Sequence, residues 1–87
     1  MYNIGFTIRW KEELVASSPE GSLIFELTMG KLHLYFPDEN CWKNSAPEWA
    51  KMKYDIYLSA STDWCRQNNI PISIVPNAYL WEEKEQK

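Results

Sequence analysis

Apolar and polar residues alternate along the first part of the chain. Every second position there is apolar, namely Ile4, Phe6, Ile8 and Trp10. A period of two is typical of a β-strand with one buried and one solvated face. The pattern therefore predicts a strand over residues 3–11, with Trp10 facing the core.

A second alternating region, residues 22–36, predicts a β-hairpin. The preceding residues 12–21 are expected to form the connection, because they contain the turn-favouring cluster Ser-Ser-Pro-Glu-Gly. Centring the hairpin turn on residues 29–30 places the apolar residues on one face, whereas a slip of one residue would oppose Phe25 to His33. The predicted core-face pairs are Leu27–Leu32, Phe25–Leu34 and Leu23–Phe36, and the other face pairs Thr28–Lys31, Glu26–His33 and Ile24–Tyr35.

Residues 45–48, Ser-Ala-Pro-Glu, read as the start of a helix. Ser45 can accept a hydrogen bond from the amide of Glu48, whose carboxylate can return to the cap, and Pro47 loses no helical hydrogen bond in the first turn. The predicted helix runs for about six turns to Gln67. It is expected to end there because of the residues that follow, Asn68, Asn69 and Pro71.

One side of this helix is apolar. At about 100° per residue, the arc expected to face the sheet holds Ala50, Tyr54, Tyr57, Leu58, Trp64 and Cys65. Trp49, Met52 and Ile56 fall on a flank of that arc. They are expected either to lie beneath a loop over residues 37–45 or to form an exposed apolar ridge.

The end of the chain completes the predicted fold. Alternating isoleucines predict a strand over residues 70–75, and residues 78–81 predict a short fifth strand or a helical turn. Residues 82–87 are expected to form a charged, frayed tail. The predicted class is α+β, with an antiparallel sheet of 4–5 strands, one long helix packed on one face and the order β-β-β-α-β(-β). Residues 1–81 would form a single small domain.

Composition restricts the class of protein further. The 87 residues have an apolar fraction of 45%, a charged fraction of 24% and a net charge of −3, as in a folded globular domain. No apolar run reaches the roughly 18 residues of a membrane span, and the first ten residues lack the basic head of a signal peptide. We therefore expect a cytoplasmic protein without membrane association, in which Cys41 and Cys65 are reduced.

The five tryptophans suggest a function, because a core of this size does not easily bury that many large rings. Exposed Trp, Tyr and Met are enriched at the centres of protein interfaces. We expect a non-enzymatic protein-binding module, such as an accessory, inhibitor or immunity-type protein, without a cofactor or metal. A homodimer is a further possibility. The predicted partner-binding residues are Trp42, Trp49, Met52, Ile56 and Trp81. The alternative is that all five tryptophans belong to the core.

A second hypothesis is a single-stranded nucleic-acid binder, since aromatic rings near cations can stack on bases. It would use Trp42, Tyr35, Lys31 and Lys43. The acidic excess and the lack of a basic stripe disfavour this function.

A third hypothesis is an enzyme subunit, in which His33 would act with Asp38 or Cys41 in a shared site. No motif that would orient the imidazole accompanies it. The series His33, Asp38, Glu39 and Cys41 also matches none of the usual metal-ligand spacings. We therefore expect His33 to lie on the exposed face of the hairpin.

Overall fold

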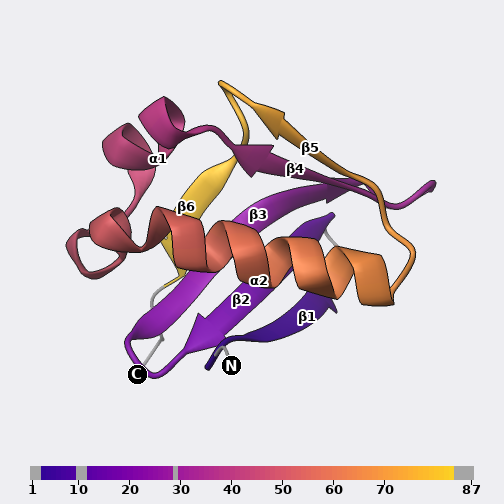
Figure 1. Cartoon of the computed structure of the whole chain (residues 1–87), viewed down its shortest axis with the longest axis horizontal. Helices are drawn as coiled ribbons and strands as arrows, with labels where there is room; N and C mark the ends of the chain where they lie inside the picture. The colour runs from indigo at the N-terminus through magenta and orange to yellow at the C-terminus, as the bar shows by residue number, and fades with distance from the viewer. Residues whose placement is uncertain (1–2, 10–11, 29, 84–87) are drawn as a thin grey trace.

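In the computed structural model, the chain folds into a six-stranded sheet with helices on one face (Figure 1). The structure describes residues 3–9, 12–28 and 30–83. The strands are β1 Gly5–Arg9, β2 Glu13–Ser18, β3 Gly21–Thr28, β4 His33–Pro37, β5 Ile72–Val75 and β6 Leu80–Glu83. The helices are α1 Glu39–Ser45, the 3₁₀ helix η1 Glu48–Lys53 and α2 Tyr54–Gln67. The predicted α+β class is confirmed, with the observed order β-β-β-β-α-α-β-β.

The sheet is mixed but mostly antiparallel. β1, β2 and β3 form an antiparallel meander, and the free edge of β3 is shared by β4 and β6. β5 pairs with β4 in parallel, which the predicted antiparallel sheet did not include. The parallel pairing follows from the long connection between the two strands. α1, η1 and α2 return the chain from the end of β4 to the level at which β4 begins, so β5 can run in the same direction beside it.

The alternation of apolar and polar residues did not predict β2. Residues 13–18 were assigned to a connection, yet they lie between β1 and β3 and pair with both. Leu14, Val15 and Ala16 are all buried, so both sides of the strand are covered and no alternation is visible in the sequence. The predicted chain reversal does occur at residues 19–20, directly after this strand.

The hairpin of β3 and β4 has the predicted apolar face but a different register. Leu27 pairs with Leu34 and Glu26 with Tyr35, two residues away from the predicted partners Leu32 and His33. A shift of two residues keeps every side chain on its original face, because the side-chain period of a strand is two. Within the turn, the Thr28 hydroxyl donates to the Lys31 carbonyl oxygen at 2.9 Å. Met29 lies outside the described residues.

The helical region starts earlier than predicted. Residues 39–45, expected in a loop, form α1, because the Asp38 carboxylate accepts a hydrogen bond from the Cys41 amide at 2.8 Å and caps that helix. Ser45, the predicted cap, is instead the last residue of α1. The single helix of about six turns is therefore wrong. The predicted end is confirmed, with Asn69 in the left-handed region at φ 57°.

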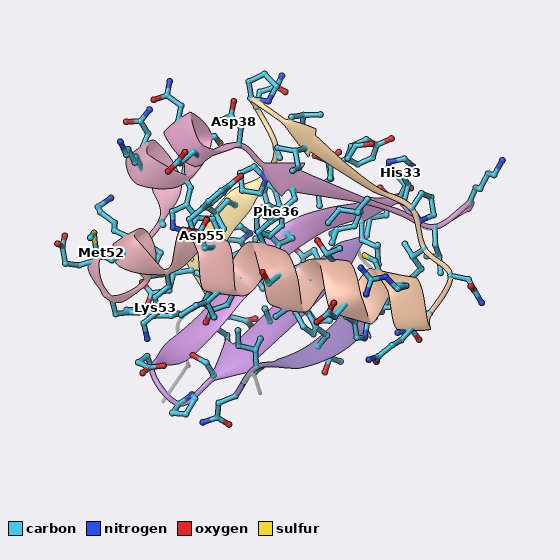
Figure 2. All side chains as sticks on the ribbon, viewed as in Figure 1. His33, Phe36, Asp38, Met52, Lys53 and Asp55 are labelled. Carbon is cyan, nitrogen blue, oxygen red and sulfur yellow. The ribbon has the colours of Figure 1, made fainter. Side chains whose placement is uncertain are left out.

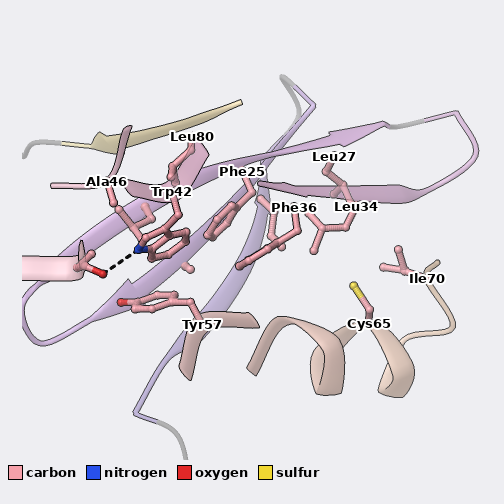
Figure 3. Close-up of a cluster of buried hydrophobic side chains, with 14 residues drawn as sticks. Phe25, Leu27, Leu34, Phe36, Trp42, Ala46, Tyr57, Cys65, Ile70 and Leu80 are labelled. Atoms are coloured by element: carbon pink, nitrogen blue, oxygen red, sulfur yellow. Dashed lines mark hydrogen bonds between the residues drawn. The ribbon is translucent and has the colours of Figure 1, made fainter. Parts of the chain in front are cut away.

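The core lies between the sheet and the helices, as Figure 3 shows. Trp42 of α1 stacks on Phe36 and Phe25 with ring centroids 5.8 and 6.3 Å away, and Tyr57 of α2 lies at 5.6 Å. The Trp42 indole nitrogen donates to the Ala50 carbonyl oxygen at 2.9 Å. The molecule is thus a small α+β domain with an aromatic cluster that includes Trp42 and Trp49.

The apolar arc predicted for the long helix does face the sheet. Ala50, Tyr57 and Cys65 are buried, and Tyr54, Leu58 and Trp64 pack against the same cluster. Trp64 contacts Phe6 of β1 at a centroid distance of 5.5 Å, in agreement with its predicted place in the core. Trp10, expected in the core as well, lies outside the described residues.

The described part of the chain contains no helix that is long and apolar enough to cross a membrane. At the C-terminal end, Glu82 and Glu83 do not belong to a frayed tail, because they pair with Leu23 and Ser22 in the sheet. Residues 84–87 of the predicted tail lie outside the described part.

Candidate functional site

The five residues predicted to bind a partner do not form one surface. Trp42 is completely buried, so its predicted exposure is wrong. Trp49 is half-buried, and its indole nitrogen donates to a Glu82 carboxylate oxygen at 2.9 Å. Met52 and Ile56 are 94% and 48% exposed, whereas Trp81 is 44% exposed on the opposite side of the sheet. Whether the exposed members bind a partner stays a prediction.

Trp42 is buried because α1 exists. An unstructured loop over residues 37–45 could have left this ring outside, but the helix capped by Asp38 directs it onto Phe25 and Phe36. The same helix brings Trp42 to the Ala50 carbonyl, which satisfies the only polar atom of the indole. One predicted interface residue is therefore a structural residue of the core.

The face of the sheet opposite α2 carries the other exposed aromatic residues, and no described helix covers it (Figure 1). The strand alternation places Ile24 and Glu26 of β3 on this face, since Leu23, Phe25 and Leu27 face the helices. Register then puts Val15 and Trp81 on either side of Ile24, and Glu13 and Tyr35 on either side of Glu26. We call this surface the open face.

Two aromatic side chains project from the open face close to β6. Tyr79 and Trp81 are 43% and 44% exposed, and their rings meet edge-on with centroids 6.1 Å apart. On the same face Ile24 has no exposure and Val15 has 8%, although no described helix lies on this side. Trp81 is the register neighbour of Ile24, so the aromatic pair lies beside buried apolar residues of the open face.

An ion-pair network borders the two rings. The Arg9 guanidinium of β1 donates to the Glu13 carboxylate of β2 and, at 2.8 Å, to the Glu83 carboxylate of β6. β2 and β3 lie between β1 and β6 in the sheet, so the Arg9 side chain reaches across the open face. The hydrogen bond to Glu83 raises the pKa of Arg9 most, and the hydrogen bond to Glu13 raises it further, so the guanidinium stays charged. We call Arg9, Glu13, Tyr79, Trp81 and Glu83 the open-face cluster.

Tyr79 is chemically tied to this network. Burial is the main cause that raises the pKa of the Tyr79 hydroxyl above its ordinary value of 10.0, and the negative charge of Glu13 raises it further. The phenol therefore stays neutral at physiological pH and can donate or accept a hydrogen bond. The cluster combines two half-exposed rings and an arginine, residue types that are enriched at the centres of protein interfaces, with carboxylates of the kind found at their polar rims.

The sequence contained a signal for Tyr79 that the prediction did not use. Residues 78–81 alternate small or aliphatic with aromatic side chains, so a strand there would place Tyr79 and Trp81 on one face. The roles of Arg9, Glu13 and Glu83 could not be predicted in the same way. They depend on β2 and on the pairing of β6 with β3.

The residues of the predicted enzyme site are not brought together. The His33 imidazole stacks on Tyr35 at 4.5 Å and its Nε2 atom lies 2.8 Å from the Ser73 hydroxyl oxygen. Asp38 follows the other end of β4, about 16 Å along the strand from His33. Asp38 caps α1, and the Cys41 thiol donates to the Ala78 carbonyl oxygen at 3.6 Å. Among the described residues, no group of three or more potential ligands could hold a metal ion.

The predicted nucleic-acid site loses its central ring. Trp42 is buried and cannot stack on a base, while Tyr35 is half-buried beneath its stack with His33. Lys31 and Lys43 are exposed but lie in the β3–β4 turn and in α1, respectively. The two cysteines are free thiols, as expected from the sequence, and Cys65 is buried.

Comparison of the chain with protein-family models, curated proteins and solved structures finds no significant match. The function is therefore inferred from the geometry of this chain.

Proposed function

We propose that this chain binds another protein through the open-face cluster. The observation that carries the proposal is the Tyr79–Trp81 pair, two half-exposed rings packed edge-on over a sheet face without a described helix. Solitary exposed apolar residues are ordinary on protein surfaces, but two adjacent large rings beside buried apolar residues are typical of binding sites.

The cluster is well suited to act as an anchor. Trp81 belongs to β6, whose backbone is paired with β3, so the ring is held on a regular element. Aromatic side chains bury a large area while losing little rotamer freedom, and they dominate the binding energy of many interfaces. Because Arg9 is already fixed by Glu13 and Glu83, little additional ordering is required when a partner docks.

Charge indicates the chemistry of the partner. On the described strands of the open face, Arg9 is accompanied by three carboxylates, Glu13, Glu26 and Glu83. Glu26 lies directly opposite Glu13 in register, so two like charges face each other there. A segment with an apolar anchor beside lysine or arginine would relieve this repulsion. A second copy would bring the same acidic surface, which disfavours a symmetric dimer through this face.

The experiment is a selection of binding peptides. A phage-displayed library of random peptides is selected on the folded chain, and the affinity of the enriched peptides is measured by isothermal titration calorimetry. We expect enriched peptides that contain Lys or Arg beside an aromatic or aliphatic residue. Trp81→Ala should weaken them by roughly thirtyfold or more, equivalent to about 2 kcal/mol. Association should also slow as salt is added.

Met52→Ala is the matched control, since Met52 is 94% exposed but does not belong to the open face. It should leave the affinity of the same peptides unchanged. Peptides that bind the Trp81→Ala variant as well as the parent would contradict the proposal. A mixed-sequence oligonucleotide that binds the parent at low salt and is lost in Trp81→Ala would assign this face to nucleic acid instead.

A further inference from the structure

The sheet has two outer edges, β1 on one side and β5 on the other. In Figure 2, the labelled His33 lies on the side of β4 and β5, and β1 forms the opposite margin of the sheet. β5 is protected against pairing with another chain, because it has only four residues and is flanked by Pro71 and Pro76. β1 keeps an unbroken register with β2, and its one charged side chain, Arg9, reaches across the open face to Glu83. Within its described residues, β1 therefore lacks the outward charge, proline or bulge that protects most edge strands.

The outer side of β1 presents backbone groups that no described residue pairs. The Leu27 amide of β3 donates to the Glu12 carbonyl oxygen at 3.2 Å, which fixes the positions at which β2 bonds to β3. Hydrogen-bonded and non-hydrogen-bonded pairs alternate along antiparallel strands. Carried across β2, this alternation assigns the bonds between β1 and β2 to Gly5, Thr7 and Arg9. The amide and carbonyl groups of Phe6 and Ile8 therefore point outward from the edge of the sheet.

The side chains at this edge leave the end of the main core incompletely covered. Phe6 and Trp64 are half-buried, with ring centroids 5.5 Å apart. Ile8, which pairs with Leu14 of the core, is 39% exposed, and Ile4 just before β1 is half-buried against the same cluster. A strand added to β1 would therefore bury apolar surface as well as pair the free backbone groups.

We propose that β1 pairs in antiparallel with β1 of a second copy of this chain, about a two-fold axis at Thr7. In this register all five residues of β1 lie opposite a residue of the other β1, and the outward groups of Phe6 meet those of Ile8. Pairs of an aromatic with a β-branched residue and pairs of two threonines are both favourable across strands. Gly5 lies opposite Arg9, so no like charges face each other, and no heavy atom lies within 4 Å of the Gly5 Cβ position. The strand is thus complementary to itself.

The proposed dimer leaves the open face accessible. A two-fold axis perpendicular to the sheet places the helices of both copies on one side and both open faces on the other. The proposal therefore goes beyond the protein-binding function and does not depend on it. Pairing of β1 with itself is also closed at two copies, whereas pairing of β1 with β5 of another copy would continue into a chain of molecules. Because five paired residues bury less than the roughly 1,000 Å² of a stable interface, we expect a dissociation constant on the order of 100 μM.

The test is sedimentation equilibrium of the whole chain under reducing conditions, from about 10 μM to about 1 mM. We expect the average mass to rise from that of the monomer toward that of the dimer and no further. Ile8→Lys places a charge on the edge, opposite Phe6 of the second copy, and should weaken association by roughly tenfold or more. Ile74→Lys is the matched control, because it makes the same change at a 51% exposed isoleucine of β5, and it should leave association unchanged.

An engineered disulfide tests the register in a Cys41→Ser background, which removes the half-exposed thiol. Thr7→Cys places two thiols opposite each other in a non-hydrogen-bonded pair, with Cα atoms about 4.5 Å apart and within reach of a disulfide. Gly5→Cys places its two thiols four residues apart in register, about 13 Å along the strands. Mild oxidation should therefore give a covalent dimer with Thr7→Cys and not with Gly5→Cys.

Three results would overturn the proposal. The first is a mass that stays monomeric up to about 1 mM, and the second is a mass that grows beyond the dimer. The third is association that a folded Ile74→Lys variant loses and a folded Ile8→Lys variant keeps, since this would assign the contact to β5. Cross-linking of Gly5→Cys in place of Thr7→Cys would overturn the axis at Thr7.

Discussion

Cys65 shows how burial of one residue makes stability depend on pH. The side chain is 1% exposed, and desolvation raises the pKa of the thiol from 9.0 to about 11. The neutral thiol is therefore favoured in the folded state, while the unfolded chain releases its proton near pH 9. Its contribution to stability is complete below pH 9 and is lost as the pH rises toward 11.

We predict that the parent loses about 2 kcal/mol more stability than Cys65→Ala between neutral pH and pH 11. The measurement is the free energy of unfolding in urea at a series of pH values. Tyr54 and Tyr57, whose pKa values burial also raises, are present in both proteins and provide the common background. If the free energy of unfolding of the two proteins changed equally with pH, the raised pKa of the Cys65 thiol in the folded state would be contradicted.

The positions of some aromatic residues, but not of others, could be predicted from the sequence. Trp64 and Tyr57 were correctly placed toward the sheet because the helical period alone orients them. Trp42 could not be placed, because its orientation depends on α1, and the cap of that helix lies in an apparently polar loop. Trp81 is exposed, which the sequence left open, and Arg9 and Glu83, which form an ion pair near it, come from opposite ends of the chain.

At the scale of elements, α1 depends on a local signal that a direct experiment can test. Its only side-chain cap among the described residues is the hydrogen bond from the Cys41 amide to Asp38 Oδ1, 2.8 Å long. We predict that Asp38→Ala lowers the free energy of unfolding by about 1 kcal/mol, because the amide loses its acceptor. Asp38→Asn retains an acceptor and should cost much less. Equal losses for both variants in urea unfolding would contradict the cap.

The element errors have a common physical cause. β2 is covered on both sides, so its apolar run showed no alternation, and the hairpin of β3 and β4 admits two registers with the same apolar face. The end of α2 was predicted correctly, since Asn69 gives a local signal. Elements were therefore predictable where one side chain or one period decides the structure, and not where pairing with a distant strand decides it.

On the scale of the whole molecule, the topology could be predicted only in outline. The α+β class follows from the order of strands and helix. The parallel pairing of β4 with β5 and the position of β6 beside β3 are decided by contacts between distant parts of the chain. These contacts create the open face, because they bring Trp81 next to Ile24 and Glu83 within reach of Arg9. The candidate site was thus less predictable than the fold that carries it.

Trp49 links three distant parts of the chain. It lies in η1, donates to Glu82 of β6 at 2.9 Å and packs on Gly21 at the start of β3, where an added Cβ would lie 2.7 Å from Trp49 Cζ2. Because Glu82 holds the indole, the ring cannot easily move away from a new methyl group. We therefore predict that Gly21→Ala lowers the free energy of unfolding by about 1–3 kcal/mol through overpacking alone.

Two further variants serve as controls for Gly21→Ala, and the stability of each is measured by thermal and urea unfolding. Gly5→Ala introduces a methyl group with no heavy atom within 4 Å, so it should leave stability unchanged or slightly increased. Trp49→Phe removes the part of the indole nearest to Gly21, and the double variant with Gly21→Ala should lose less stability than the sum of the single variants. Additive losses would show that contact with Trp49 is not the cause of the destabilisation by Gly21→Ala.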